Sequence, residues 1–224
     1  MSQLSFTFQN SSNKNPFSEE DFLVLAENSA AFEVLNKFFA QKDFTESQFE
    51  SLMIRGEAAS GKSHLLNIFA KKFQAEILKK ENISSVNPAN FFVENNFYIF
   101  DNINEIKDEE LILRVINSAT EAKAFLILSL QNHRQFSLRD LTSRLKNILT
   151  IDIENPSLES IKQLLANGFS RRQIKLSGLL IDFIANHIER SYTAILAAIK
   201  IVEFYCNENG KNIGMKEVRA LFMK

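Results

Sequence analysis

The sequence has no tryptophan, one cysteine, three prolines and six glycines in 224 residues. A single thiol excludes an internal disulfide, and the apolar neighbours of Cys206 predict a buried core side chain. His64, His133 and His187 lie far apart and lack the spacing of metal ligands. Because no apolar run approaches the length of a membrane span and no signal-peptide pattern is present, we expect a cytoplasmic protein without membrane contact.

Neither sign of charge dominates. The chain carries 26 Lys and Arg against 27 Asp and Glu, for a net charge of −1. This balance excludes a broadly basic surface that would wrap DNA, so we expect any contact with DNA to be indirect. The apolar content of 45% and charged content of 24% are ordinary for a globular protein long enough for one or two domains.

One short stretch carries the strongest chemical signal. It lies between an apolar run that predicts a strand and a run that predicts a helix, which is the context of a phosphate-binding loop. Glycines let the backbone N–H groups approach phosphates, the lysine reaches the outer phosphates, and the last hydroxyl binds Mg²⁺. An ordinary Gly/Ser turn would not explain the lysine, the hydroxyl and both flanks together. The stretch is Gly56, Glu57, Ala58, Ala59, Ser60, Gly61, Lys62 and Ser63.

A second apolar run, 97–100, ends in Asp101. This predicts a buried parallel strand that delivers a carboxylate to hold Mg²⁺ in a phosphate-loop protein; the alternative is an aspartate that caps a turn. Asn102 follows, where an acid would orient the attacking water, and a neutral amide favours slow or absent hydrolysis. Ser129 ends the next predicted strand, either as a sensor of the terminal phosphate or as a simple strand-end serine.

Alternating strands and helices predict an α/β fold with a parallel sheet covered on both faces. After Pro156 only helical patterns remain, so we expect a flexible tail over 1–16, an α/β nucleotide-binding domain over 17–155 and a small helical lid over 156–224. Asn28 with Ser29 is expected to cap the first helix. Arg171, Arg172 and Lys175 are expected between the first two lid helices, as a solvated turn or as a contact with DNA or a partner.

The N-terminal residues form a short apolar alternation on a polar, turn-rich tether. From the residues alone, such a peptide either packs onto its own domain or is offered to a partner, and the first is favoured. The residues concerned are Gln3, Leu4, Ser5, Phe6 and Phe8.

The motifs together resemble those of the DnaA-related AAA+ proteins over about residues 17–222. The phosphate loop continues through His64 into two leucines, and 141–145 is similar to the L-x-S-R-[LF] box that carries an arginine finger in that family. Residues 21–24 with Asn28 and Ala31 resemble the segment that frames the adenine, so Phe22 and Val24 are expected to contact the nucleotide. The resemblance implies an AAA+ phosphate-loop core followed by a helical lid.

Within this family the sequence resembles the shorter, Hda-type regulators of the initiator DnaA. Their N-terminal peptide docks on the replicative sliding clamp, the β subunit of DNA polymerase III, so the resemblance reverses the preference for self-packing of residues 3–8. It implies that Arg144 acts in trans on ATP held by DnaA. Without the surrounding motif, the favoured interpretation of Arg144 would be a surface arginine paired with Asp140. It also implies association with the replisome. Because the nucleotide of this family lies between two subunits, the resemblance is compatible with self-association as well.

The resemblance implies a bound adenine nucleotide, ATP or ADP with Mg²⁺ held at Ser63 and Asp101. The family's second sensor arginine is replaced by Thr193, and together with Asn102 this favours resident ADP and weak or absent intrinsic hydrolysis. The chain would then activate the DnaA ATPase rather than act as an ATPase itself. The alternatives are a DnaC-like helicase loader, which would need a helicase-binding extension and competent catalytic groups, and a fragment of a DnaA-like initiator.

Overall fold

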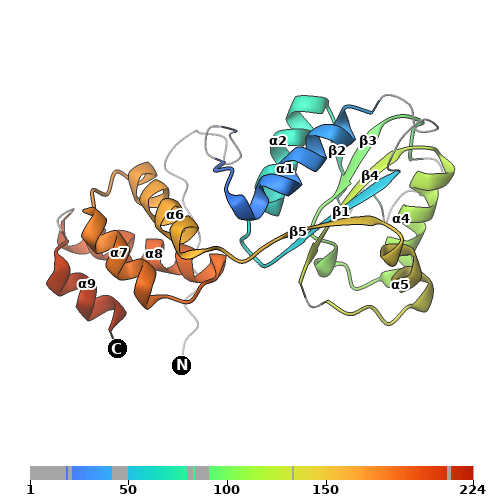
Figure 1. The fold of residues 1–224 in the computed structure, drawn as a ribbon. Helices are drawn as coiled ribbons and strands as arrows, with labels where there is room; N and C mark the ends of the chain where they lie inside the picture. Colours follow the sequence, from blue (N-terminus) through green and yellow to red (C-terminus); the bar gives the residue numbers. More distant parts are fainter. Residues whose placement is uncertain are drawn as a thin grey trace.

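The computed structural model describes residues 19, 22–41, 50–79, 83, 91–132, 134–210 and 213–223. These residues form an α/β domain and a helical domain joined by an extended linker, 154–157 (Figure 1). The expected clamp peptide, Gln3 to Phe8, lies outside the described residues. None of the described helices is long and apolar enough to cross a membrane.

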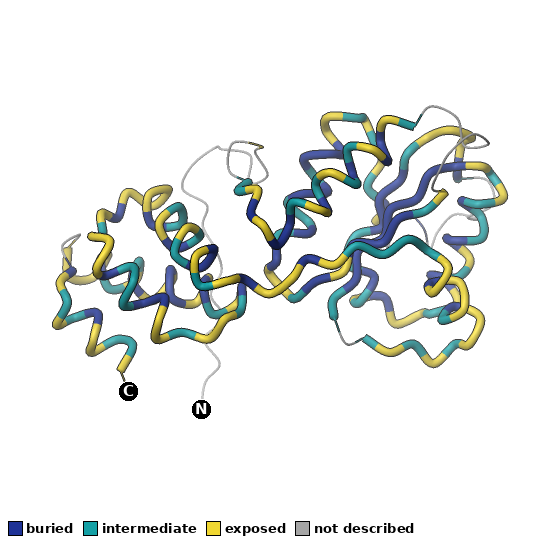
Figure 2. Tube along the Cα trace, in the orientation of Figure 1, coloured by how far each residue is buried: buried dark blue, intermediate teal, exposed yellow. Residues whose placement is uncertain are grey.

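A five-stranded parallel sheet in the order β2-β3-β4-β1-β5 forms the centre of the first domain. Strand β4 is almost wholly buried, because its unbroken apolar sequence is covered on both faces (Figure 2). The strands are β1 (Ser51–Gly56), β2 (Glu76–Ile77), β3 (Phe97–Phe100), β4 (Phe125–Gln131) and β5 (Leu149–Ile153).

Helices α1 (Ala26–Phe39) and α2 (Lys62–Phe73) cover one face of the sheet. Their core is unusually rich in phenylalanine, with the rings of Phe39 and Phe73 stacked 4.9 Å apart. Helices α4 (Glu109–Glu121) and α5 (Arg139–Lys146) pack on the other face. Alternate residues along β1, β3 and β4 therefore enter two separate cores.

The second domain is a set of four described helices with its own apolar core. Cys206 is buried in that core as predicted, and burial raises the pKa of its thiol. The helices are α6 (Leu158–Arg171), α7 (Gly178–His187), α8 (Tyr192–Asn209) and α9 (Met215–Phe222).

Two helix boundaries differ from the expectation. Helix α1 begins at Ala26, so Asn28 is its third residue rather than its cap, and the Asn28 Oδ1 accepts a hydrogen bond of 2.8 Å from the Leu25 N–H. Helix α6 continues to Arg171, beyond the run 157–165 that its apolar residues suggested. Arg171 therefore belongs to a helix and not to an interhelical turn. The helix continues through Gly168, which packs closely on Ile199 of α8.

Candidate functional site

The stretch 56–63 forms a loop between β1 and α2, so its strand–loop–helix context is as expected. Gly61 adopts φ +88°, a left-handed conformation that favours glycine, and a Cβ there would lie 3.3 Å from the Phe22 Cε2 atom. At Gly56 a Cβ would lie 2.9 Å from the Ser60 Oγ and 3.1 Å from the Ile153 Cβ. At both positions the neighbouring atoms lie too close for a larger residue, so glycine is required. The loop leads directly into the N-terminus of α2, and helix N-termini favour anions.

Lys62 is the first residue of α2, and its side chain folds back over the loop. Its Nζ donates to the Gly56 carbonyl at 3.0 Å and to the Glu57 carbonyl at 2.7 Å, with a longer contact of 3.3 Å to the Ser60 Oγ. Burial lowers the pKa of Lys62, while the negative charges of Asp101 and Glu57 oppose that effect. The ammonium group is therefore held at the centre of the loop.

The acid at the end of β3 lies two strands away from the phosphate loop, because β4 is inserted between β1 and β3. Two strand spacings amount to about 10 Å. Ser129 lies on the intervening strand β4: its buried hydroxyl donates to the Asp101 Oδ1 and accepts a hydrogen bond of 2.7 Å from the Asn102 N–H. The Asn102 side chain turns to the carboxylate of Glu105. Ser129 thus fixes the position of Asp101, a role that sequence reasoning did not assign to it.

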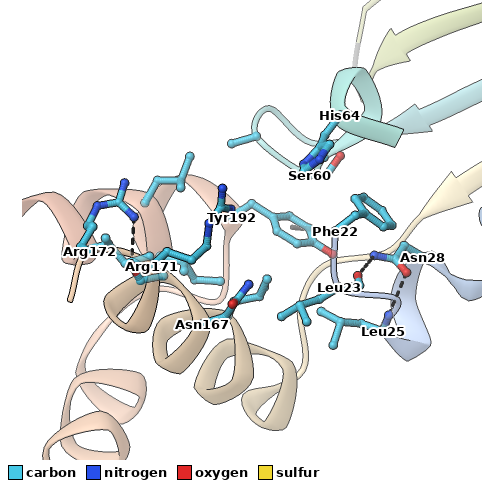
Figure 3. A pocket seen from close by; sticks show the side chains of 17 residues that line it. Phe22, Leu23, Leu25, Asn28, Ser60, His64, Asn167, Arg171, Arg172 and Tyr192 are labelled. Carbon is cyan, nitrogen blue, oxygen red and sulfur yellow. Dashed lines mark hydrogen bonds between the residues drawn. The ribbon is translucent and has the colours of Figure 1, made fainter. Parts of the chain in front are cut away.

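A cavity lies where the phosphate loop meets the lid (Figure 3). Its first wall consists of the segment before α1 and of the loop residues Ala59, Ser60 and Gly61 with His64. Its second wall comes from α6 and α8, including Asn167 and Tyr192, which the sequence analysis did not select. The shared cavity can hold a molecule that contacts both domains at once.

Of the predicted nucleotide contacts, five line this cavity: Phe22, Ala59, Ser60, Gly61 and His64. The others do not line it: Val24, Gly56, Ala58, Lys62, Ser63, Ser129 and Thr193. Phe22 and His64 line it together, with their rings in edge contact at 5.4 Å. Val24 is 52% exposed and its neighbours Leu23 and Leu25 line the cavity instead. Thr193 is exposed, and its hydroxyl lies 3.1 Å from the Ser191 hydroxyl.

Asn28 shapes the apolar side of the cavity. Its side chain is 5% exposed, and its Nδ2 donates to the Leu23 carbonyl at 2.9 Å while its Oδ1 accepts from the Leu25 N–H. Both hydrogen bonds are visible in Figure 3. One amide therefore fixes the backbone of the segment that presents Leu23 and Leu25, because an amide both donates and accepts.

The two domains are joined by a buried polar cluster next to the cavity. Glu27 of α1 accepts hydrogen bonds from the Ser157 N–H at 2.7 Å and from the Ser160 hydroxyl at 2.7 and 2.9 Å. Beside it, the Tyr192 hydroxyl donates to the Glu154 carbonyl at 3.0 Å. Burial, with the negative charges of Glu27, Glu57 and Glu154, raises the pKa of Tyr192 to about 12. A side chain of the cavity wall therefore also contacts the linker.

Replacing Glu27 with glutamine is expected to destabilise the protein by about 1–3 kcal/mol at neutral pH, because charged hydrogen bonds across the linker are weakened. Burial alone would raise the pKa of Glu27, but the Ser157 and Ser160 donors outweigh it and the pKa is lowered. A carboxylate whose pKa is lower in the folded state stabilises the protein when the pH is above its unfolded-state pKa. This stabilisation is lost as the pH falls through the folded-state pKa. Urea unfolding should therefore show that the difference in free energy of unfolding between Glu27→Gln and wild type becomes smaller from pH 7 to pH 3.

The matched control is Glu33→Gln, an exposed position of the same helix α1. Its unfolding curve should follow wild type at every pH. A difference in free energy of unfolding between Glu27→Gln and wild type that stays constant down to pH 3 would contradict a stabilising role of the ionised carboxylate.

Helix α5, which carries Arg144, packs on the face of the sheet opposite α1 and α2 (Figure 1), and Arg144 does not line the cavity. Leu141 and Leu145 anchor α5 in the core, while Arg144 is exposed. The start of α5 is fixed by Glu109, whose carboxylate accepts a 2.7 Å hydrogen bond from the Leu138 N–H. Among the described residues Arg144 forms no ion pair with Asp140. A rigid helix thus presents its guanidinium to the surroundings.

The same architecture occurs in solved structures of a replication initiation protein and of a Holliday junction branch migration motor. Domain III of the DnaA replication initiation protein of Thermotoga maritima is 17% identical and covers 95% of this chain and 98% of its own, with a TM-score of 0.72. The chain has the AAA+ fold. The RuvB Holliday junction branch migration motor of Thermotoga maritima is 14% identical, covers 93% of this chain and 72% of its own, and has a TM-score of 0.67.

AMPPCP-bound DnaA from Aquifex aeolicus is similar as well, with 16% identity, 93% of this chain and 71% of its own covered, and a TM-score of 0.67. No protein-family model and no curated protein matches the sequence. At these identities the likeness establishes the AAA+ fold, and the expected α/β core followed by a helical lid is confirmed.

Proposed function

We propose that this AAA+ chain binds ADP or ATP between its two domains and regulates the replication initiator DnaA while docked on the sliding clamp. The observation that carries the proposal is the cavity between the phosphate loop and the lid, which is lined on the loop side by Ala59, Ser60 and Gly61. The neighbouring Lys62 is bonded to the carbonyl of Gly56 in the same loop. A nucleotide fits this arrangement, because a glycine-rich loop that leads into a helix N-terminus suits phosphates, and apolar side chains line the rest of the cavity.

Mg²⁺ would accompany the nucleotide, held by the Ser63 hydroxyl and the Asp101 carboxylate. Asp101 suits this role because Ser129 orients one of its oxygens at the end of β3. Bound there, the ion would neutralise phosphate charge. Asn102 has an amide where a water-orienting acid is needed, and it bonds to Glu105. Slow turnover of the chain's own nucleotide follows, and ADP is the favoured resident.

The regulatory part of the proposal rests on Arg144 and on the N-terminal peptide. Arg144 is exposed and remote from its own cavity, so it is suited to a nucleotide held by another subunit, for which we propose DnaA. The peptide Gln3 to Phe8 offers one amide for polar contacts and three apolar anchors for a hydrophobic pocket on the clamp. The clamp would then bring this chain to initiator molecules near replicating DNA.

The test measures hydrolysis of DnaA-bound ATP in the presence of clamp loaded on DNA. Adding the wild-type chain should accelerate hydrolysis, and the Gln3→Ala and Leu4→Ala variants should lose both clamp retention and acceleration. Gln9→Ala, in the same N-terminal stretch but beyond the peptide, serves as the control. Retention on the clamp that is unchanged by Gln3→Ala and Leu4→Ala would remove clamp docking from the proposal.

A further inference from the structure

The lid wall of the cavity carries a neutral amide, that of Asn167 on helix α6. Asn167 follows Leu164 by three residues, so both lie on the helix face that lines the cavity. The next residue, Gly168, packs so closely on α8 that a Cβ there would lie 2.4 Å from the Ile199 Cδ1 atom. This contact holds the turn of α6 that carries Asn167 against a buried part of the lid.

Two other neutral polar side chains line the cavity away from the phosphate loop, Asn28 and Tyr192, and both are hydrogen-bonded within the protein. The Asn28 amide bonds in both directions to the backbone before α1, and the Tyr192 hydroxyl donates to the Glu154 carbonyl. The half-buried amide of Asn167 forms no hydrogen bond with any residue that the structure describes. Its oxygen and its amino group are therefore both available to a molecule in the cavity.

The position of Asn167 relates it to one end of a nucleotide. Figure 3 shows Asn167 across the cavity from Ser60 and His64, with its amide pointing from α6 toward Tyr192. A nucleotide carries its phosphates and its base at opposite ends. Phosphates placed at the loop would therefore direct the base toward the side of the cavity on which Asn167 lies.

We infer that Asn167 hydrogen-bonds to the edge of the base and makes the site selective for adenine over guanine. This rests on the proposed function, because it concerns the same cavity. Adenine presents an amino donor beside the N7 acceptor, and an amide matches this pair with its own oxygen and amino group. Guanine presents two acceptors at the same edge, so the Asn167 oxygen would face a carbonyl oxygen without a proton between them.

Calorimetric titration of the full chain with ADP and GDP tests this inference. Wild type should bind ADP more tightly than GDP by about fivefold to a hundredfold, the discrimination that one bidentate amide–adenine pair provides. Asn167→Ala should lose most of this preference through weaker ADP binding, while its GDP affinity changes by less than about threefold. Asn167→Asp should favour GDP, because a carboxylate only accepts hydrogen bonds and guanine offers two neighbouring N–H donors at another edge.

Asn207→Asp is the matched control, since Asn207 is an exposed asparagine of the lid helix α8 that does not line the cavity. It adds the same charge to the lid and should keep the wild-type ratio of ADP to GDP affinity. Thermal unfolding of each nucleotide-free variant should match wild type, because the Asn167 amide has no hydrogen bond to a described residue to lose.

The ratio of the two affinities separates base recognition from a structural role of Asn167. A ratio that is unchanged in Asn167→Asp, or an equal loss of ADP and GDP binding, overturns the inference while nucleotide binding stands. Equal binding of ADP and GDP by wild type overturns it as well. Failure of wild type to bind either nucleotide instead overturns the proposed function, and the inference with it.

Discussion

Replacing Arg144 with alanine is expected to abolish the stimulation of DnaA-bound ATP hydrolysis, a loss of about 10³–10⁵ in rate if this arginine acts as a finger in trans. The guanidinium would offset the charge that develops on the transferred phosphoryl group, and Lys146, the other cation in the last turn of α5, lacks its planar fork of donors. The structure makes such an effect specific, because Glu109 and two buried leucines fix α5 whether or not Arg144 is present. The measurement is single-turnover hydrolysis by DnaA with clamp on DNA.

Arg139→Ala provides the control for this experiment, because Arg139 is also an exposed arginine of α5. It should leave the stimulation within a few-fold of wild type, whereas Arg144→Lys should fail almost as completely as Arg144→Ala. Stimulation that survives in Arg144→Ala would exclude the arginine-finger mechanism. Clamp retention and ADP binding should be unaffected by either substitution, because α5 lies on the opposite face of the sheet from the cavity.

Lys62→Ala is expected to weaken ADP and ATP binding by roughly 30-fold to several thousandfold, the effect of removing a buried charged partner. Lys62 is 7% exposed and is already held over the loop by the Gly56 and Glu57 carbonyls. A phosphate group that enters the loop would replace these weaker acceptors, so the ammonium group is close to its binding position beforehand. Calorimetric titration of the variant with each nucleotide measures the loss.

Lys37→Ala is the matched control, since Lys37 is an exposed lysine of α1. Its nucleotide affinity should equal that of wild type. Near-normal affinity in Lys62→Ala would mean that the loop 56–63 does not bind the phosphates. The nucleotide-free variant should remain folded, because the lysine contributes hydrogen bonds within a loop and not to the apolar core.

The core of the fold could be predicted because its signals are local. The apolar runs that became β3 and β4 and the glycine-rich loop before α2 each specify their element from neighbouring residues. Helix α6 shows the limit of this approach: its visible apolar run ended near 165, and the following residues were taken for a turn. They continue the helix because Gly168 packs on Ile199, a contact with another helix that no local pattern contains.

The site was predictable on the loop side and not on the lid side for the same reason. Ser60, Gly61 and His64 belong to one motif, whereas the cavity wall formed by Leu164 and Tyr192 depends on how the domains meet. A periodic signal on α6 was present, since its lining residues repeat at helical spacing. Val24 faces solvent because an extended segment alternates its side chains, and Leu23 and Leu25 point to the cavity.

Hydrogen–deuterium exchange with and without ADP tests the central claim most directly, namely that one nucleotide is held between the phosphate loop and the lid. ADP should slow exchange both in residues 58–66 and in the lid segments 164–172 and 192–199, with α9 unchanged. Protection confined to the phosphate loop, or absent from both segments of the lid, would contradict a site that the two domains share.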